Sequence, residues 1–106
     1  MSWEVLVFAR VISVQTTAGQ VDDAIEIAKQ QLPGARGQQG YQGFLVLADH
    51  PSGKLMTISL WESREDLHAV EARAAQVRAV AAQSLGTAAP PVDIYQVEIA
   101  DPALHA

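Results

Sequence analysis

The chain of 106 residues is long enough for one domain with a modest core, and its composition, 49% hydrophobic and 18% charged, is typical of a globular protein. Its net charge of −5 argues against nucleic acid or an anionic membrane as partner. The absence of cysteine excludes disulfides, thiolate catalysis and cysteine-ligated metal.

The apolar segment at residues 5–14 is the part of the chain that most resembles a targeting signal. Glu4 precedes it, Arg10 interrupts it, and no small-residue cleavage site follows it. No apolar run reaches the roughly 20 residues of a membrane span. We therefore expect a cytoplasmic protein.

The first predicted element is a long strand over Trp3–Thr16, which is rich in β-branched residues. Both of its faces are apolar, apart from one charge at Arg10. Alternation places on one face Leu6, Phe8, Arg10, Ile12 and Val14, and on the other Val5, Val7, Ala9, Val11 and Ser13.

A helix is predicted after Gly19, because apolar residues recur at helical spacing and two aspartates occupy the first turn. Pro33–Gly34 is expected to end or kink it. Residues 35–43 contain three glycines and are expected to form a connection with room for one more helical turn. The apolar residues that recur at helical spacing are Val21, Ala24, Ile25, Ala28 and Leu32.

A β-hairpin is predicted next, with strands Phe44–Asp49 and Lys54–Trp61 around a five-residue loop at 49–53. Ser63 is positioned to cap a second helix that reaches about Leu85. In the Lys54–Trp61 strand, alternation separates Met56, Ile58 and Leu60 from Leu55, Thr57, Ser59 and Trp61.

The end of the chain predicts a linker at 86–91, a last strand over Val92–Ile99, and a loose tail at 101–106 after a domain at 1–100. The order is therefore β-α-β-β-α-β. Right-handed crossovers place the antiparallel strands in the order 4-1-3-2 with both helices on one side. This is the α+β, ferredoxin-like sandwich.

Two helices cover one face of such a sheet, yet the strands are apolar on both faces. The uncovered face measures about 19 by 17 Å, or roughly 300 Å², at standard strand spacing and rise. Monomers seldom expose an apolar patch of that size. We expect a homodimer packed sheet to sheet; the alternative is a monomer whose second face is more polar.

Three motifs carry a resemblance to a known family: Pro33-Gly34-Ala35-Arg36, Gly40-Tyr41-Gln42-Gly43-Phe44, and Ile58-Ser59-Leu60-Trp61-Glu62-Ser63. Over residues 5–100 the chain resembles the antibiotic-biosynthesis-monooxygenase-like proteins of the dimeric α/β-barrel superfamily. The resemblance implies a homodimer with a pocket between sheet and helices in each subunit. Some members oxidise polycyclic aromatic compounds with molecular oxygen and no cofactor, others cleave haem, and many have no established activity.

The candidate site residues come from the resemblance in the case of Trp61, and from the strand pattern in the case of Arg10, the one charge inside a central strand. Trp61 matches the family's tryptophan and is expected either to form a pocket wall or to plug the core. Arg10 would hold an enolate, phenolate or carboxylate, or it would pair structurally with Glu98 or another carboxylate. It stands where family oxygenases often carry asparagine. The candidate catalytic residues are Trp61 and Arg10, and the candidate substrate-binding residues are Phe8, Thr57, Ser59 and His68.

The histidines give no metal site. His68 is either a general base or a solvated helix residue, while His50 and His105 form no metal-ligand spacing. Haem-cleaving relatives carry a ligand histidine farther along the second helix. Near that place this chain has Glu71, which disfavours haem degradation.

The leading hypothesis, which the resemblance implies, is a monooxygenase that acts without cofactor or metal on an electron-rich aromatic such as an anthrone or quinol. The alternative is a non-catalytic small-molecule-binding or stress-related homodimer. A haem binder is the weakest of the three.

Overall fold

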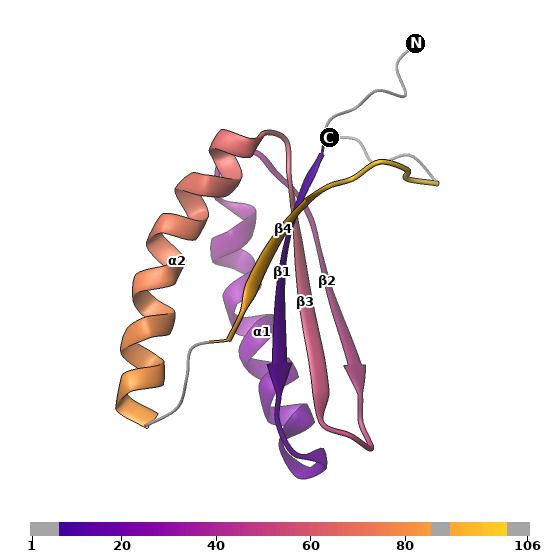
Figure 1. The fold of residues 1–106 in the computed structure, drawn as a ribbon, viewed down its shortest axis with the longest axis vertical. Helices are drawn as coiled ribbons and strands as arrows, with labels where there is room; N and C mark the ends of the chain where they lie inside the picture. Colours follow the sequence, from indigo (N-terminus) through magenta and orange to yellow (C-terminus); the bar gives the residue numbers. More distant parts are fainter. Residues whose placement is uncertain (1–6, 86–89, 102–106) are drawn as a thin grey trace.

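The computed structural model describes residues 7–85 and 90–101, without the side chains of 77, 78 and 80–85. The sheet contains four strands in the order β2-β3-β1-β4, with every neighbouring pair antiparallel, as predicted. Both helices lie on one side of it (Figure 1). The elements are β1 (Phe8–Gln15), the 3-10 turn η1 (Ala18–Gln20), α1 (Val21–Arg36), β2 (Tyr41–Asp49), β3 (Lys54–Trp61), α2 (Arg64–Leu85) and β4 (Val92–Gln96).

The two central strands define the two faces of the sheet. Phe8 lies opposite Trp61 and Arg10 opposite Ser59, so these four side chains share the face covered by the helices. Phe8 and Trp61 pack there with Leu67 of α2. The opposite face, which we call the open face, carries a second buried cluster of Val7, Ala9, Val11 and Leu60. The predicted alternation in both strands is confirmed.

Of the two outcomes predicted for Pro33–Gly34, an end or a kink, the end is wrong, because α1 continues through Pro33 to Arg36. Proline removes one backbone donor and its ring crowds the carbonyl four residues earlier, and α1 ends three residues after it. Arg36 then lies in the last turn, where a positive charge suits the helix dipole.

The second strand begins at Tyr41, three residues before the predicted start at Phe44. A β-bulge explains the difference, because both Tyr41 and Gly43 pair with neighbouring residues of β3 and leave Gln42 as an extra residue. An extra residue interrupts the alternation that a sequence pattern can detect.

The outer parts of the last and first strands also differ from prediction. β4 ends at Gln96 rather than Ile99, although the Val97 N–H still donates to the Val7 carbonyl over 2.8 Å. The predicted first strand began at Trp3, and its residues 3–6 lie outside the described residues, as do the predicted linker residues 86–89 and the tail residues 102–106.

Two local features stabilise the hairpin and the start of α2: the backbone conformation of Gly53 and the helix cap at Ser63. Gly53 has φ +77°, and a Cβ there would collide with the carbonyl of Thr16, whose N–H donates to the Gly53 carbonyl over 2.8 Å. The Ser63 hydroxyl accepts the Asp66 N–H at 3.0 Å, which is the predicted helix cap. Among the described residues, no helix has the length and apolar character needed to cross a membrane.

Candidate functional site

Trp61 is the most deeply placed aromatic side chain of the helix-covered face, with 1% of its surface exposed. Its indole Nε1–H donates to the Ser59 hydroxyl over 2.9 Å. The Tyr41 ring meets it edge to face, with centroids 5.9 Å apart. The indole donor therefore already has an acceptor inside the protein, and the plug described as the alternative for Trp61 matches its packing.

Phe8 completes the aromatic part of the site. It is buried against Trp61 and Leu67, and the guanidinium carbon of Arg64 lies 4.8 Å from the centre of its ring. Arg64 is the first residue of α2 and Phe8 the first of β1, so this cation–π contact holds the start of α2 over the start of β1.

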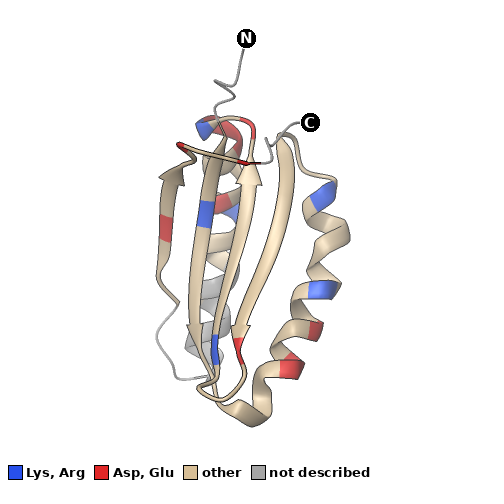
Figure 2. Cartoon of the chain, turned by 90° about the vertical axis from the view of Figure 1, so that its right-hand side faces the viewer, with Lys and Arg blue, Asp and Glu red and all other residues tan. Residues whose placement is uncertain are grey.

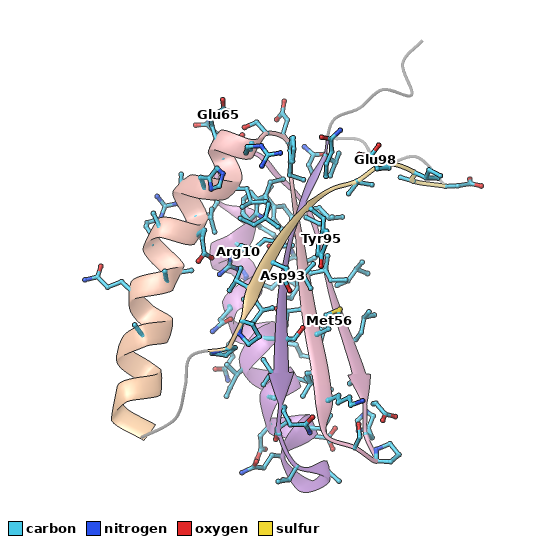
Figure 3. All side chains as sticks on the ribbon, viewed as in Figure 1. Arg10, Met56, Glu65, Asp93, Tyr95 and Glu98 are labelled. Atoms are coloured by element: carbon cyan, nitrogen blue, oxygen red, sulfur yellow. The ribbon has the colours of Figure 1, made fainter. Side chains whose placement is uncertain are left out.

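Arg10 is buried between β1 and α2, where its Nε donates to the Glu71 carboxylate over 2.6 Å. The side chains of Arg10 and Glu71 are 9% and 22% exposed. Figure 3 shows Arg10 on the helix side of the sheet and Glu98 at the far end of the chain's last segment, away from it. The carboxylate that Arg10 meets is thus Glu71 and not Glu98, which is exposed.

The geometry of this ion pair leaves part of the guanidinium available. Within the described part of the chain, Arg10 makes its hydrogen bond through Nε alone. Its two Nη groups carry four further N–H donors that point to no described acceptor. Buried donors of this kind are normally satisfied by protein, water or ligand.

Sequence reasoning missed Glu71 as the partner of Arg10, although a signal was present. Glu71 follows the fully buried Leu67 by four residues, so the two lie on one face of α2. A carboxylate on the buried face of a helix and a guanidinium in a buried strand each require a partner. Pairing the carboxylate of Glu71 with the guanidinium of Arg10 on this ground would have predicted the contact.

The structure brings together four of the six candidate residues: Phe8, Arg10, Ser59 and Trp61. Thr57 lies on the same face one step farther along β3, opposite Ile12. His68 is exposed on α2 and does not join them. The arrangement is a buried aromatic cluster beside a guanidinium that contacts a carboxylate and whose Nη donors meet no acceptor in the described part of the chain. In residues 7–85 and 90–101, no three acidic or histidine side chains are grouped to hold a metal ion.

The fold and the matched segment define the class of this protein. The family model described as antibiotic biosynthesis monooxygenase matches residues 7–82, and the chain belongs to that family. The matched segment includes β1, both strands of the hairpin and most of α2, and therefore all six candidate site residues.

Similar proteins share the fold more closely than the sequence. A monooxygenase from the gene ActVA-Orf6 of Streptomyces coelicolor, solved with the ligand Nanaomycin D, superposes with a TM-score of 0.69 at 17% identity, covering 92% of each chain. The heme-degrading protein Rv3592 of Mycobacterium tuberculosis gives 0.64 at 14% identity, covering 91% of this chain and 96% of that one.

Curated relatives include an uncharacterised Mycobacterium tuberculosis protein, Rv2557, which is 27% identical over 93 residues. These residues are 87% of this chain and 41% of the relative, so the chain spans less than half the length of the curated relatives it matches.

Proposed function

We propose that this protein is a cofactor-independent monooxygenase that acts on a flat, electron-rich aromatic such as an anthrone or quinol. The observation that carries the proposal is the buried guanidinium of Arg10 on the same sheet face as Trp61 and Ser59 in a member of this family, with Nη donors that meet no acceptor among the described residues. A buried cation with unused donors is suited to an anionic oxygen.

In the proposed reaction the substrate supplies the electrons that reduce oxygen. For an anthrone, loss of one proton gives an enolate, whose charge the Arg10 guanidinium stabilises. One atom of O2 becomes the new carbonyl oxygen, and the other leaves as water with the two hydrogens of the ring methylene. The protein's part is to bind the anion, orient its ring along Phe8 and Trp61, and exclude water. Thr57 and Ser59 would line the same face.

Oxygen consumption with a panel of anthrones and hydroquinones tests this proposal. We expect Arg10→Ala to lower the rate by roughly 100-fold, the usual effect of removing a group that stabilises a developing oxyanion. Trp61→Phe keeps an aromatic ring at this position and should lower the rate of oxygen consumption by less than Arg10→Ala does. Arg36→Ala removes an exposed arginine at the end of α1 and should match the unsubstituted protein. Equal rates in the Arg10, Trp61 and unsubstituted proteins would contradict the proposed site.

A second candidate function is a non-catalytic small-molecule-binding homodimer. The 2.6 Å contact between Arg10 and Glu71 favours it, because a guanidinium bound to a carboxylate can be purely structural. An anthrone that binds stoichiometrically, without oxygen uptake above the buffer rate, would support this function instead.

We further propose that two copies pack through the open face. The exposed fractions there are 50% for Leu45, 50% for Leu47, 36% for Met56 and 57% for Tyr95. The strand register places all four on the face opposite the helices, and Figure 3 shows Met56 and Tyr95 on that side. Figure 2, which looks onto this face, shows charged positions only sparsely along the strands. A second copy supplies a matching apolar surface.

Sedimentation of the purified protein tests the dimer. We expect twice the 11.3 kDa of one chain at micromolar concentration. Leu47→Glu places a charge on each copy within the contact and should weaken association by roughly 100-fold or more. Ile27→Glu is the matched control, because Ile27 is a similarly exposed apolar residue, at 55%, on α1. A chain that sediments as a monomer before any substitution would overturn the proposed assembly.

A further inference from the structure

We propose that Glu71 is the proton acceptor of this site: it takes the proton of an acidic aromatic hydroxyl or enol while Arg10 binds the resulting oxyanion. The inference rests on the proposed function and names the residue that generates the substrate anion. In this step the substrate O–H bond breaks and an O–H bond forms on the Glu71 carboxyl group. No electrons are transferred, and oxygen reacts only afterwards.

The contact geometry supports this role. Glu71 accepts the Arg10 Nε–H at 2.6 Å, and its side chain is 22% exposed where that of Arg10 is 9% exposed. The carboxylate is therefore the more accessible member of the pair. An aromatic hydroxyl that reaches the Nη donors of Arg10, which meet no acceptor among the described residues, also comes within a few ångströms of the carboxylate, because Nε and Nη belong to one guanidinium plane.

The charge balance of the site supports it as well. Before binding, the Arg10 cation and the Glu71 carboxylate are in contact. After the transfer the site holds the Arg10 cation, an aryl oxide and a neutral Glu71 carboxyl, so its net charge is unchanged. Binding a preformed aryl oxide beside a charged Glu71 would bring two negative groups together next to the Arg10 guanidinium, and like charges in contact repel each other.

Other described groups near this part of the fold are less suited to the task. His68 and Glu65 of α2 are exposed, and Figure 3 shows Glu65 at the start of the helix, at the top of the view. Arg64 lies over the Phe8 ring, and the Arg73 guanidinium donates to the Gln38 side chain. Ser59 accepts from Trp61 and has an ordinary hydroxyl, which is a weak base.

The test uses 2-hydroxyanthraquinone, a flat tricyclic dye that changes colour on ionisation and contains no oxidisable methylene. Titrations are made below the pKa of the free dye. In the unsubstituted protein we expect the bound dye to have the colour of its anion, with no proton released to the buffer, because the proton remains on Glu71. The dissociation constant should then be independent of pH in this range.

Glu71→Gln keeps the size of the side chain and removes the acceptor. The dye should still bind as its anion, but one proton per dye must now enter the buffer. Its affinity should therefore rise tenfold for each pH unit up to the pKa of the free dye. Glu65→Gln makes the same charge change at an exposed position of α2 and should show the pH-independent behaviour of the unsubstituted protein.

Two further variants keep the test decisive if Glu71→Gln folds poorly. Glu71→Asp retains a carboxylate and should restore pH-independent binding. The double variant Arg10→Leu with Glu71→Leu removes both charges and should bind the dye in its neutral colour. The inference is overturned if the unsubstituted protein fails to bind the dye, binds it neutral, or releases a proton on binding. It is also overturned if Glu71→Gln shows no pH dependence. An anionic bound dye without oxygen uptake from anthrones would retain this inference and reject the proposed oxygenase.

Discussion

Replacing Trp61 with alanine is expected to lower the free energy of unfolding by about 3–5 kcal/mol, as is usual for truncating a large buried aromatic side chain. Trp61 is 1% exposed and packs against Phe8 and Leu67, so the indole leaves a cavity that strands and helix cannot easily close. The loss also leaves the Ser59 hydroxyl without the indole donor. Urea denaturation, followed by far-ultraviolet circular dichroism, measures the change.

Two controls separate cavity formation from other effects. Trp61→Phe keeps an aromatic ring and should cost about 1–2 kcal/mol, mainly through the lost hydrogen bond and part of the ring volume. Ile99→Ala truncates a side chain that is 87% exposed and should leave stability within about 0.5 kcal/mol. All proteins are compared at one concentration, since association stabilises the folded state. A Trp61→Ala midpoint equal to that of the unsubstituted protein would show that this region is not part of the stable core.

Breaking the ion pair on one side is the second change with a large expected effect. Glu71→Leu alone should cost about 3 kcal/mol, because it leaves the buried Arg10 guanidinium without the carboxylate that it contacts. Arg10→Leu removes the same contact and should cost less. Arg10 should be the more costly one to leave behind, since it is the less exposed member of the pair. Denaturation midpoints of the single variants measure both costs.

The double variant is the informative comparison. Replacing both charges with leucine should cost far less than the sum of the single changes, because apolar residues of similar volume substitute well for a buried ion pair. Glu65→Leu serves as a control for a carboxylate lost from the exposed side of α2. Strictly additive costs would mean that Arg10 and Glu71 do not interact, against the 2.6 Å contact.

The strand faces and the sheet order could be predicted from the sequence because each depends on a regular period. Alternation over β1 and β3 assigned Phe8, Arg10 and Trp61 to the helix-covered face, and crossover handedness then fixed the order of strands. The cap at Ser63 was predictable for the same reason, since it depends on neighbouring residues alone.

The remaining differences arise where the period is interrupted or the contact is distant in sequence. The bulge at Gln42 concealed the start of β2, and the carboxylate that Arg10 would meet depended on how α2 lies over the sheet. The two residues of the pair are 61 positions apart. The sequence pattern places His68 on α2. Whether it faces the sheet or the solvent depends on the orientation of α2 about its own axis, and the structure shows that it is exposed.

The bulge at Gln42 has a consequence for the aromatic wall. Because side chains alternate strictly along a strand, a ladder without the extra residue would turn Tyr41 away from the helices and put Gln42 opposite Trp61. One inserted residue therefore determines whether the indole meets a ring or an amide. In a relative without this extra residue, we expect an amide or another side chain in place of the Tyr41 ring beside the tryptophan, on the same four-stranded sheet.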